Sequence, residues 1–76
     1  MYEHQTDWGK GVKIVMIRRN ISTRELSERS GVPMYKVSSV TSGAMRNDKA
    51  CNDISNYLGY SIGDLELIGR GEKAAS

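Results

Sequence analysis

The sequence predicts an all-α fold of five short helices joined by short loops. Apolar residues recur at the spacing of a helical face, and no segment alternates apolar and polar residues convincingly enough to predict a strand. Residues that typically cap the start of a helix and glycines that typically end one recur at short intervals along the chain. Seventy-six residues without a repeat or a low-complexity linker predict one domain, with an ordered core over about residues 7–69 and loose tails at 1–6 and 70–76.

The first helix is predicted over Asp7–Arg19, capped by Thr6 or Asp7. Gly9 and Gly11 weaken its first turn, each by up to about 1 kcal/mol relative to alanine. Its apolar face is expected to contain Trp8, Val12, Val15 and Met16, widened by Ile14, Ile17 and Ile21. The spacing therefore predicts that one broad side of this helix packs into the core.

The second helix is predicted to start sharply at Ser22, because Ser22 and Glu25 have the spacing of a capping box. Leu26 is its main core residue, and Ser27 is small enough to let another helix cross closely. Gly31 is expected to end the helix, since a left-handed backbone is favoured at that position and glycine adopts it without strain.

The third helix is predicted from Pro33 or Met34 to Thr41, because proline suits the first turn of a helix, where no amide donor is needed. Val37 and Val40 are expected to face the core from this helix. The serine and the glycine that follow Thr41 stop it, and residues 44–48 are expected to form a loop.

The fourth helix is predicted from residue 48 or 49 to residue 58, and Gly59 ends it. The fifth is predicted over residues 62–68, with Ser61 as its cap. The residues of these two helices that are expected to face the core are Ile54, Tyr57, Leu58, Leu65 and Ile68. Leu67 is expected to be exposed.

The second and third predicted helices have the pattern of a helix-turn-helix. Leu26, Ser27, Gly31, Val37 and Val40 stand where that motif needs an apolar residue, a small one, a turn glycine and two further apolar residues. The second helix of such a motif enters the major groove of DNA. The pattern therefore predicts a DNA-binding domain.

From Trp8 to Ile68 the chain resembles the five-helix DNA-binding domain of lambdoid phage repressors, Cro proteins and related bacterial xenobiotic-response-element regulators. The resemblance is carried by ELS at 25–27, SGV at 30–32, VS at 37–38, Val40 and Gly43, and by ISNYLGYSIGDL at 54–65. Ser27 and Pro33 depart from the pattern, because the family usually has alanine at the first position and serine or threonine at the second. The resemblance implies a phage or bacterial transcription regulator, a repressor or a Cro-like protein.

Docking of the motif on double-stranded DNA implies two sets of contact residues. The residues expected to contact base edges are Pro33, Met34, Tyr35, Lys36, Ser38 and Ser39. The residues expected to contact phosphates are Ser22, Thr23, Arg24, Arg46, Asn47 and Lys49. Because the predicted recognition helix has no Arg, Asn or Gln, its specificity is expected to depend on thymine methyl groups and DNA shape more than on bidentate hydrogen bonds.

Charge is unevenly distributed along the chain. Residues 7–49 hold nine basic and four acidic side chains, a net of +5, whereas residues 50–76 have a net of −2. A basic half that faces DNA fits this asymmetry, and a solubilising surface is the alternative explanation.

A homodimer on a short pseudo-palindromic operator is expected, because one recognition helix reads only a few base pairs. The dimer contact is expected at Tyr60, Leu67 and the turn between the fourth and fifth helices, and dimerisation only on DNA is the alternative to a stable dimer in solution. The alternative function is a protein-interaction module on the same fold, of the antirepressor or antitoxin type. The apolar residues of the recognition turn, Pro33, Met34, Tyr35 and Val37, would suit that role.

Enzymatic functions find little support in the residue types present. His4 is the single histidine and Cys51 the single cysteine, and no nucleophile with its base and no metal-ligand cluster is visible. We expect no catalysis, no metal, no cofactor and no small-molecule ligand. No apolar run approaches the roughly 20 residues of a membrane span, and the start of the chain lacks the pattern of a secretory signal, so a cytoplasmic location is expected.

Overall fold

Five helices and no strand make up residues 6–71, the part of the chain that the computed structural model describes. In chain order they are α1 (Asp7–Arg19), α2 (Thr23–Ser30), α3 (Met34–Ser42), α4 (Asp48–Leu58) and α5 (Ile62–Gly69). The all-α prediction is confirmed, and each helix begins and ends within about a residue of its predicted bounds. Of the tails predicted at 1–6 and 70–76, residues 1–5 and 72–76 lie outside the described residues.

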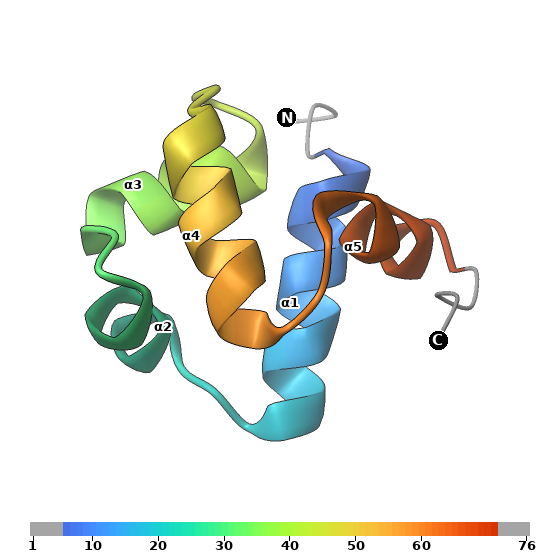
Figure 1. The fold of residues 1–76 in the computed structure, drawn as a ribbon, viewed down its shortest axis with the longest axis horizontal. Helices are drawn as coiled ribbons and strands as arrows, with labels where there is room; N and C mark the ends of the chain where they lie inside the picture. Colours follow the sequence, from blue (N-terminus) through green and yellow to red (C-terminus); the bar gives the residue numbers. More distant parts are fainter. Residues whose placement is uncertain (1–5, 72–76) are drawn as a thin grey trace.

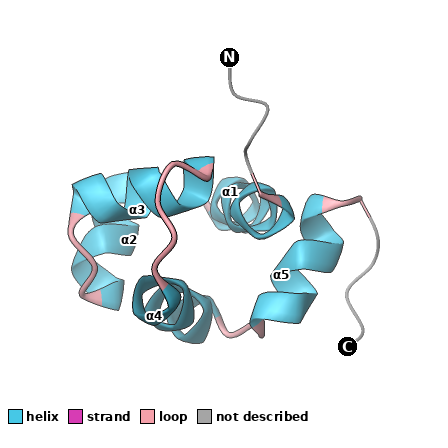
Figure 2. Ribbon diagram, turned by 90° about the horizontal axis from the view of Figure 1, so that it is seen from above, coloured by secondary structure: helices cyan, strands magenta, loops and turns pink. Residues whose placement is uncertain are grey.

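The helices are arranged around the pair α1 and α4. Figure 1 and Figure 2 both place α2 and α3 on one side of this pair and α5 on the other. α1 packs against α3 and α5, and α4 packs against α2, α3 and α5. No helix among the described residues is long and apolar enough to cross a membrane.

Local side-chain caps set the starts of four helices. The four capping residues, whose side-chain oxygen accepts from a backbone N–H at 3.0 Å, are Thr6 (from Gly9), Ser22 (from Glu25), Asn47 (from Ala50) and Ser61 (from Asp64). Pro33, which precedes α3, supplies no side-chain cap. Thr6 rather than Asp7 therefore caps α1. Only half of the predicted capping box forms, because within the described residues the Glu25 side chain makes no hydrogen bond back to Ser22.

The apolar core draws on all five helices. Its buried members are Trp8, Val12, Val15, Met16, Leu26, Val32, Val37, Val40, Ala50, Ile54, Leu58, Leu65 and Ile68. Tyr57 is half-buried against this core, as are Ile14 and Ile21. The inward positions predicted on α2, α3, α4 and α5 are confirmed, with Tyr57 only partly covered.

Ile17 was predicted to widen the apolar face of α1, and that prediction is wrong. Its side chain is 79% exposed. Ile17 comes nine positions after Trp8, and at about 100° per residue this spacing places the two side chains on opposite sides of the helix. Since Trp8 faces the core, Ile17 faces away from it.

Gly9 and Gly11 have a packing role that outweighs their low helix propensity. A Cβ atom at Gly9 would fall on the backbone carbonyl of Thr41 in α3, and one at Gly11 would fall on that of Leu65 in α5. Gly69 lies against Asp7 in the same way. These glycines let the backbones of α3 and α5 approach α1 more closely than any other residue would allow.

Arg70 was predicted to belong to a loose C-terminal tail, but it is part of the fold. It follows α5 as its C-cap, and its backbone N–H donates to the carbonyl of Glu66 at 3.0 Å. Its Nε donates to Asp7 Oδ2 at 3.1 Å, which connects the end of α5 to the start of α1. The packed part of the chain thus extends one residue beyond the predicted core of about residues 7–69.

Candidate nucleic-acid interface

The connection between α2 and α3 is tight and fixed by side chains. Gly31 has a φ of +79° and its N–H donates to Ser27 O at 3.0 Å. Ser27 Oγ donates to the carbonyl of the buried Val32 at 2.6 Å. Ser30 Oγ donates to Leu26 O at 2.6 Å and accepts from Val32 N at 3.3 Å. Two serines thus hold the turn that sets the direction of α3.

The first turn of α3 presents an exposed and partly apolar surface. Met34 is 49% and Tyr35 64% exposed, and Pro33 and Ser38 are also exposed. The opposite side of α3 is anchored, because Val37, Val40 and Thr41 are buried. The predicted base-contact residues at positions 33, 34, 35 and 38 therefore share the exposed side of a helix that is held firmly by the core.

Lys36 lies beside two residues that were predicted to contact phosphates. A hollow of about 160 Å³ between the start of α3 and the start of α4 is lined by Lys36, Asn47 and Lys49. Asp53 also lines it, and its Oδ2 lies 3.1 Å from Lys49 Nζ. Lys36 Nζ is 6.0 Å from the ring centroid of Tyr35, at the outer limit of a cation–π contact. Lys36 therefore lies between the exposed turn of α3 and the start of α4.

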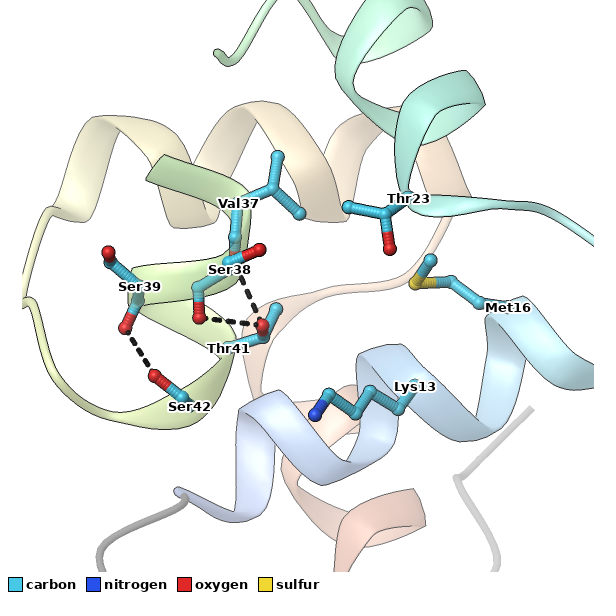
Figure 3. A pocket seen from close by; sticks show the side chains of 8 residues that line it. All are labelled: Lys13, Met16, Thr23, Val37, Ser38, Ser39, Thr41 and Ser42. Carbon is cyan, nitrogen blue, oxygen red and sulfur yellow. Dashed lines mark hydrogen bonds between the residues drawn. The ribbon is translucent and has the colours of Figure 1, made fainter. Parts of the chain in front are cut away.

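A larger groove of about 390 Å³ separates α1 and the start of α2 from α3 (Figure 3). It is lined by Lys13, Met16, Thr23, Val37, Ser38, Ser39, Thr41 and Ser42. In Figure 3 the side chain of Lys13 extends from α1 toward α3, and the hydroxyl of Thr23 is turned toward the groove. The structure thus brings Thr23, a predicted phosphate contact, together with Ser38 and Ser39, which were predicted to contact bases.

Lys13 and Ser42 were not among the predicted contact residues, although both line this groove. Ser42 comes four positions after Ser38, so helical spacing places it on the same side of α3. Lys13 comes three positions before Met16 and is exposed at the edge of α1. The helical spacing within α3 could have predicted that Ser42 lies beside Ser38. The position of Lys13 depends on how α1 crosses α3, which the spacing does not indicate.

The remaining predicted phosphate contacts lie at two separate places. Ser22 and Arg24 are exposed at the start of α2, where Arg24 Nε lies 3.7 Å from Glu28 Oε2 on the surface. Arg46 is exposed in the loop before α4 and lines a different groove, of about 420 Å³, which also contains Cys51. The structure does not bring Arg46 into the hollow that Asn47 and Lys49 share.

Cys51 is half-buried against the core. Burial raises the pKa of its thiol, the charge of Asp48 raises it further, and Arg46 opposes the effect. The thiol is therefore protonated at neutral pH and is a poor nucleophile. Among residues 6–71, no three His, Cys, Asp or Glu side chains are grouped so that they could hold a metal ion.

The residues predicted for the dimer contact are only partly accessible. Tyr60 is half-buried against the core, and the guanidinium carbon of Arg19 lies 5.6 Å from its ring centroid. Leu67 is also half-buried, so the prediction that it is exposed is only partly right.

No protein-family model, curated protein or solved structure matches the chain. The case for a function therefore depends on the arrangement of α2, α3 and the start of α4.

Proposed function

We propose that the protein is a sequence-specific DNA-binding transcription regulator in which α2 and α3 form a helix-turn-helix. The observation that carries the proposal is the first turn of α3. It exposes Met34 and Tyr35 while the far side of the helix is buried. Its Lys36 shares a hollow with Lys49 at the start of α4, and the serines that follow share a groove with Thr23 at the start of α2. This is the arrangement that a helix inserted into the major groove requires.

Base recognition is assigned to the first turns of α3. The Tyr35 hydroxyl can donate to or accept from a base edge, and its ring and the Met34 side chain can contact thymine methyl groups. Lys36 can donate to a guanine or, from its place beside Asn47 and Lys49, to a phosphate. Ser38 and Ser39 follow one turn later and complete the proposed contact surface.

Phosphate contacts are assigned to two helix starts. The backbone amides of Thr23 and Arg24 donate to no acceptor within the described residues, and they lie at the positive end of the α2 dipole. At the start of α4, Asn47 uses Oδ1 to cap the helix, which leaves its amide nitrogen available to donate. Arg46 and Lys49 add positive charge there. These contacts would position α3 without carrying sequence information themselves.

The proposed regulator acts as a homodimer on a pseudo-palindromic operator. A twofold dimer places two copies of α3 about one helical turn of DNA apart, about 34–36 Å, and so doubles the number of base pairs that are read. Tyr60 and Leu67, on the turn before α5 and on α5 itself, are the proposed dimer contact. Occupancy of the operator would then exclude or recruit RNA polymerase.

A protein-interaction module of the antirepressor or antitoxin type is the second candidate. The observation that favours it is the exposure of Met34 and Tyr35, because a partner protein would bury these side chains as well as DNA would. The interaction module assigns no role to the cations at the start of α4.

A gel-shift titration with random-sequence duplex DNA over a salt series separates the two candidates. A DNA-binding protein gives a logarithm of the binding constant that falls linearly with the logarithm of salt concentration, with a slope of about −0.9 per phosphate contact. Selection of sites from a random duplex pool should then return sequences with twofold symmetry. Absence of any shift at low salt would overturn the proposal and favour the interaction module.

A further inference from the structure

An exposed isoleucine borders a second groove at the junction of α1 and α2. The groove measures about 290 Å³ and is lined by Lys13, Met16, Ile17, Ile21, Ser22 and Thr23. Met16 is buried and Ile21 is half-buried against the core, so these two side chains form an apolar floor. Ile17, which is 79% exposed, stands at its edge. It is the most exposed of the large apolar side chains in the described residues.

The polar end of this groove is positively charged. Lys13 lies on one side and forms no ion pair within residues 6–71. On the other side is the start of α2, where the Ser22 hydroxyl oxygen already accepts from Glu25 N and the amides of Thr23 and Arg24 are without acceptors among the described residues. Lys13 is the only charged side chain among the described residues that line the groove. A carboxylate is the complementary group for this end.

We propose that this groove binds an acidic peptide segment of a partner protein. An apolar side chain of the segment packs on Ile17 and Ile21, and a neighbouring Asp or Glu carboxylate accepts from Lys13 and from the amides at the start of α2. The surface thus combines an apolar anchor site with a charge-assisted contact, which together select for sequence as well as for charge.

A second copy of the chain is a poorer occupant than a different protein. A twofold dimer through this groove would bring the Lys13 side chains of both copies close together, and like charges across an interface oppose association. A contact with the acidic residues Asp64 and Glu66 of another copy would join two different faces. Such a heterologous contact does not close on itself in a dimer.

DNA also fits this groove poorly. A phosphodiester satisfies Lys13 and the α2 amides, but it offers no apolar surface to Ile17 and Ile21. The groove does share Lys13, Met16 and Thr23 with the larger groove beside α3. A peptide seated in it covers the start of α2, so, if the proposed DNA-binding function holds, the bound peptide also lowers DNA affinity.

Selection from a random-peptide display library against the immobilised full chain, without DNA, tests the proposal. The enriched peptides should carry an apolar residue within four positions of an Asp or Glu. By fluorescence anisotropy, Ile17→Ser and Lys13→Glu should each weaken a selected peptide at least tenfold. Lys10→Glu, on the same helix but outside the groove, and Tyr35→Ser, at the exposed turn of α3, should leave its affinity unchanged, and circular dichroism confirms that every variant is folded.

Three outcomes would overturn the proposal. The first is that the library enriches no peptide, or that the enriched peptides lack acidic residues. Enriched peptides whose affinity does not change in Ile17→Ser belong to this first outcome as well. The second is self-association in sedimentation velocity that Ile17→Ser abolishes, which would assign the groove to a second copy. The third is a loss of DNA affinity in Ile17→Ser without any peptide selection, which would assign the groove to DNA. Because peptide binding is measured without DNA, failure of the DNA-binding function leaves this test intact.

Discussion

The indole nitrogen of Trp8 donates to the hydroxyl oxygen of Ser55 at 3.0 Å, and both residues are buried. The bond joins the first turn of α1 to α4 across 47 positions of sequence. An indole N–H that is removed from water without an acceptor destabilises the folded state, so Ser55 is what allows Trp8 to occupy the core. Within the described residues, no buried side-chain nitrogen or oxygen lacks a partner.

Replacing Ser55 with alanine should therefore lower the free energy of unfolding by about 1–3 kcal/mol, because the indole N–H stays buried and loses its acceptor. Urea denaturation followed by the fluorescence of Trp8, the single tryptophan, measures this directly. Ser38→Ala is the matched control, since Ser38 is exposed and its loss should change stability by less than about 0.5 kcal/mol. Equal stability of the two variants would show that the bond contributes nothing.

Two glycines should respond to alanine in opposite directions. Gly11→Ala should destabilise the fold by about 1–3 kcal/mol or more, because its Cβ meets the backbone carbonyl of Leu65 and α5 must move away from α1. Gly63→Ala should stabilise it by up to about 1 kcal/mol, because a Cβ there meets only the Ser61 hydroxyl at 3.9 Å and alanine is the better helix former. Thermal unfolding of both variants gives the comparison. A stabilised Gly11→Ala variant would contradict the close packing of α1 and α5.

The sequence predicted the helix bounds well because local interactions set them. Ser22 and Ser61 form caps with amides three positions later, and Gly31 and Gly59 end helices by their own backbone preference. The cap at Asn47 was missed because its side chain was interpreted only as a phosphate contact. Helix propensity alone predicts that Gly11 weakens the first turn of α1. Its packing role depends on contact with α5, which lies more than 50 positions away along the chain.

The candidate site was predictable where it depends on one helix and not where it depends on two. Helical periodicity placed Tyr35 on the exposed side of α3, opposite Val37. The proximity of Lys36 to Asn47 and that of Lys13 to Thr23 depend on the crossing of separate helices, which no spacing in the sequence encodes. The exposure of Ile17 could have been predicted from the sequence, since its angular position relative to Trp8 follows from helix geometry alone.

Tyr35→Ala and Lys36→Ala should each weaken binding to the selected operator by roughly 1–3 kcal/mol while the fold stays intact. Tyr35→Ala should do so without changing the salt dependence, because it removes a base contact. Lys36→Ala should also reduce the salt slope, because Lys36 lies beside the proposed phosphate contacts. Gel shifts with operator and random duplexes provide the measurement, with circular dichroism as the folding control. Unchanged operator affinity in both variants would remove the first turn of α3 from the interface.

Arg24→Ala and Arg46→Ala should weaken binding to all duplexes alike and reduce the salt slope by about one unit for each lost contact. The loss of DNA affinity should be smaller for Arg24→Ala than for Arg46→Ala, because Arg24 already forms a surface ion pair with Glu28. Arg29→Ala, at the exposed end of α2, is the matched charge control and should leave the slope unchanged. A change in base preference at constant slope would contradict the phosphate role.

Leu67→Asp should abolish cooperative binding to an operator with two half-sites and preserve binding to a single half-site. The reason is that a carboxylate placed in a twofold contact meets its symmetry mate and is desolvated. Because Leu67 is half-buried, the milder Leu67→Gln accompanies it, and circular dichroism confirms that both variants fold. Gel shifts report the order in which the half-sites fill, and sedimentation velocity reports the state of the free protein. If both folded variants fill the two half-sites as cooperatively as the parent, the dimer contact lies away from α5.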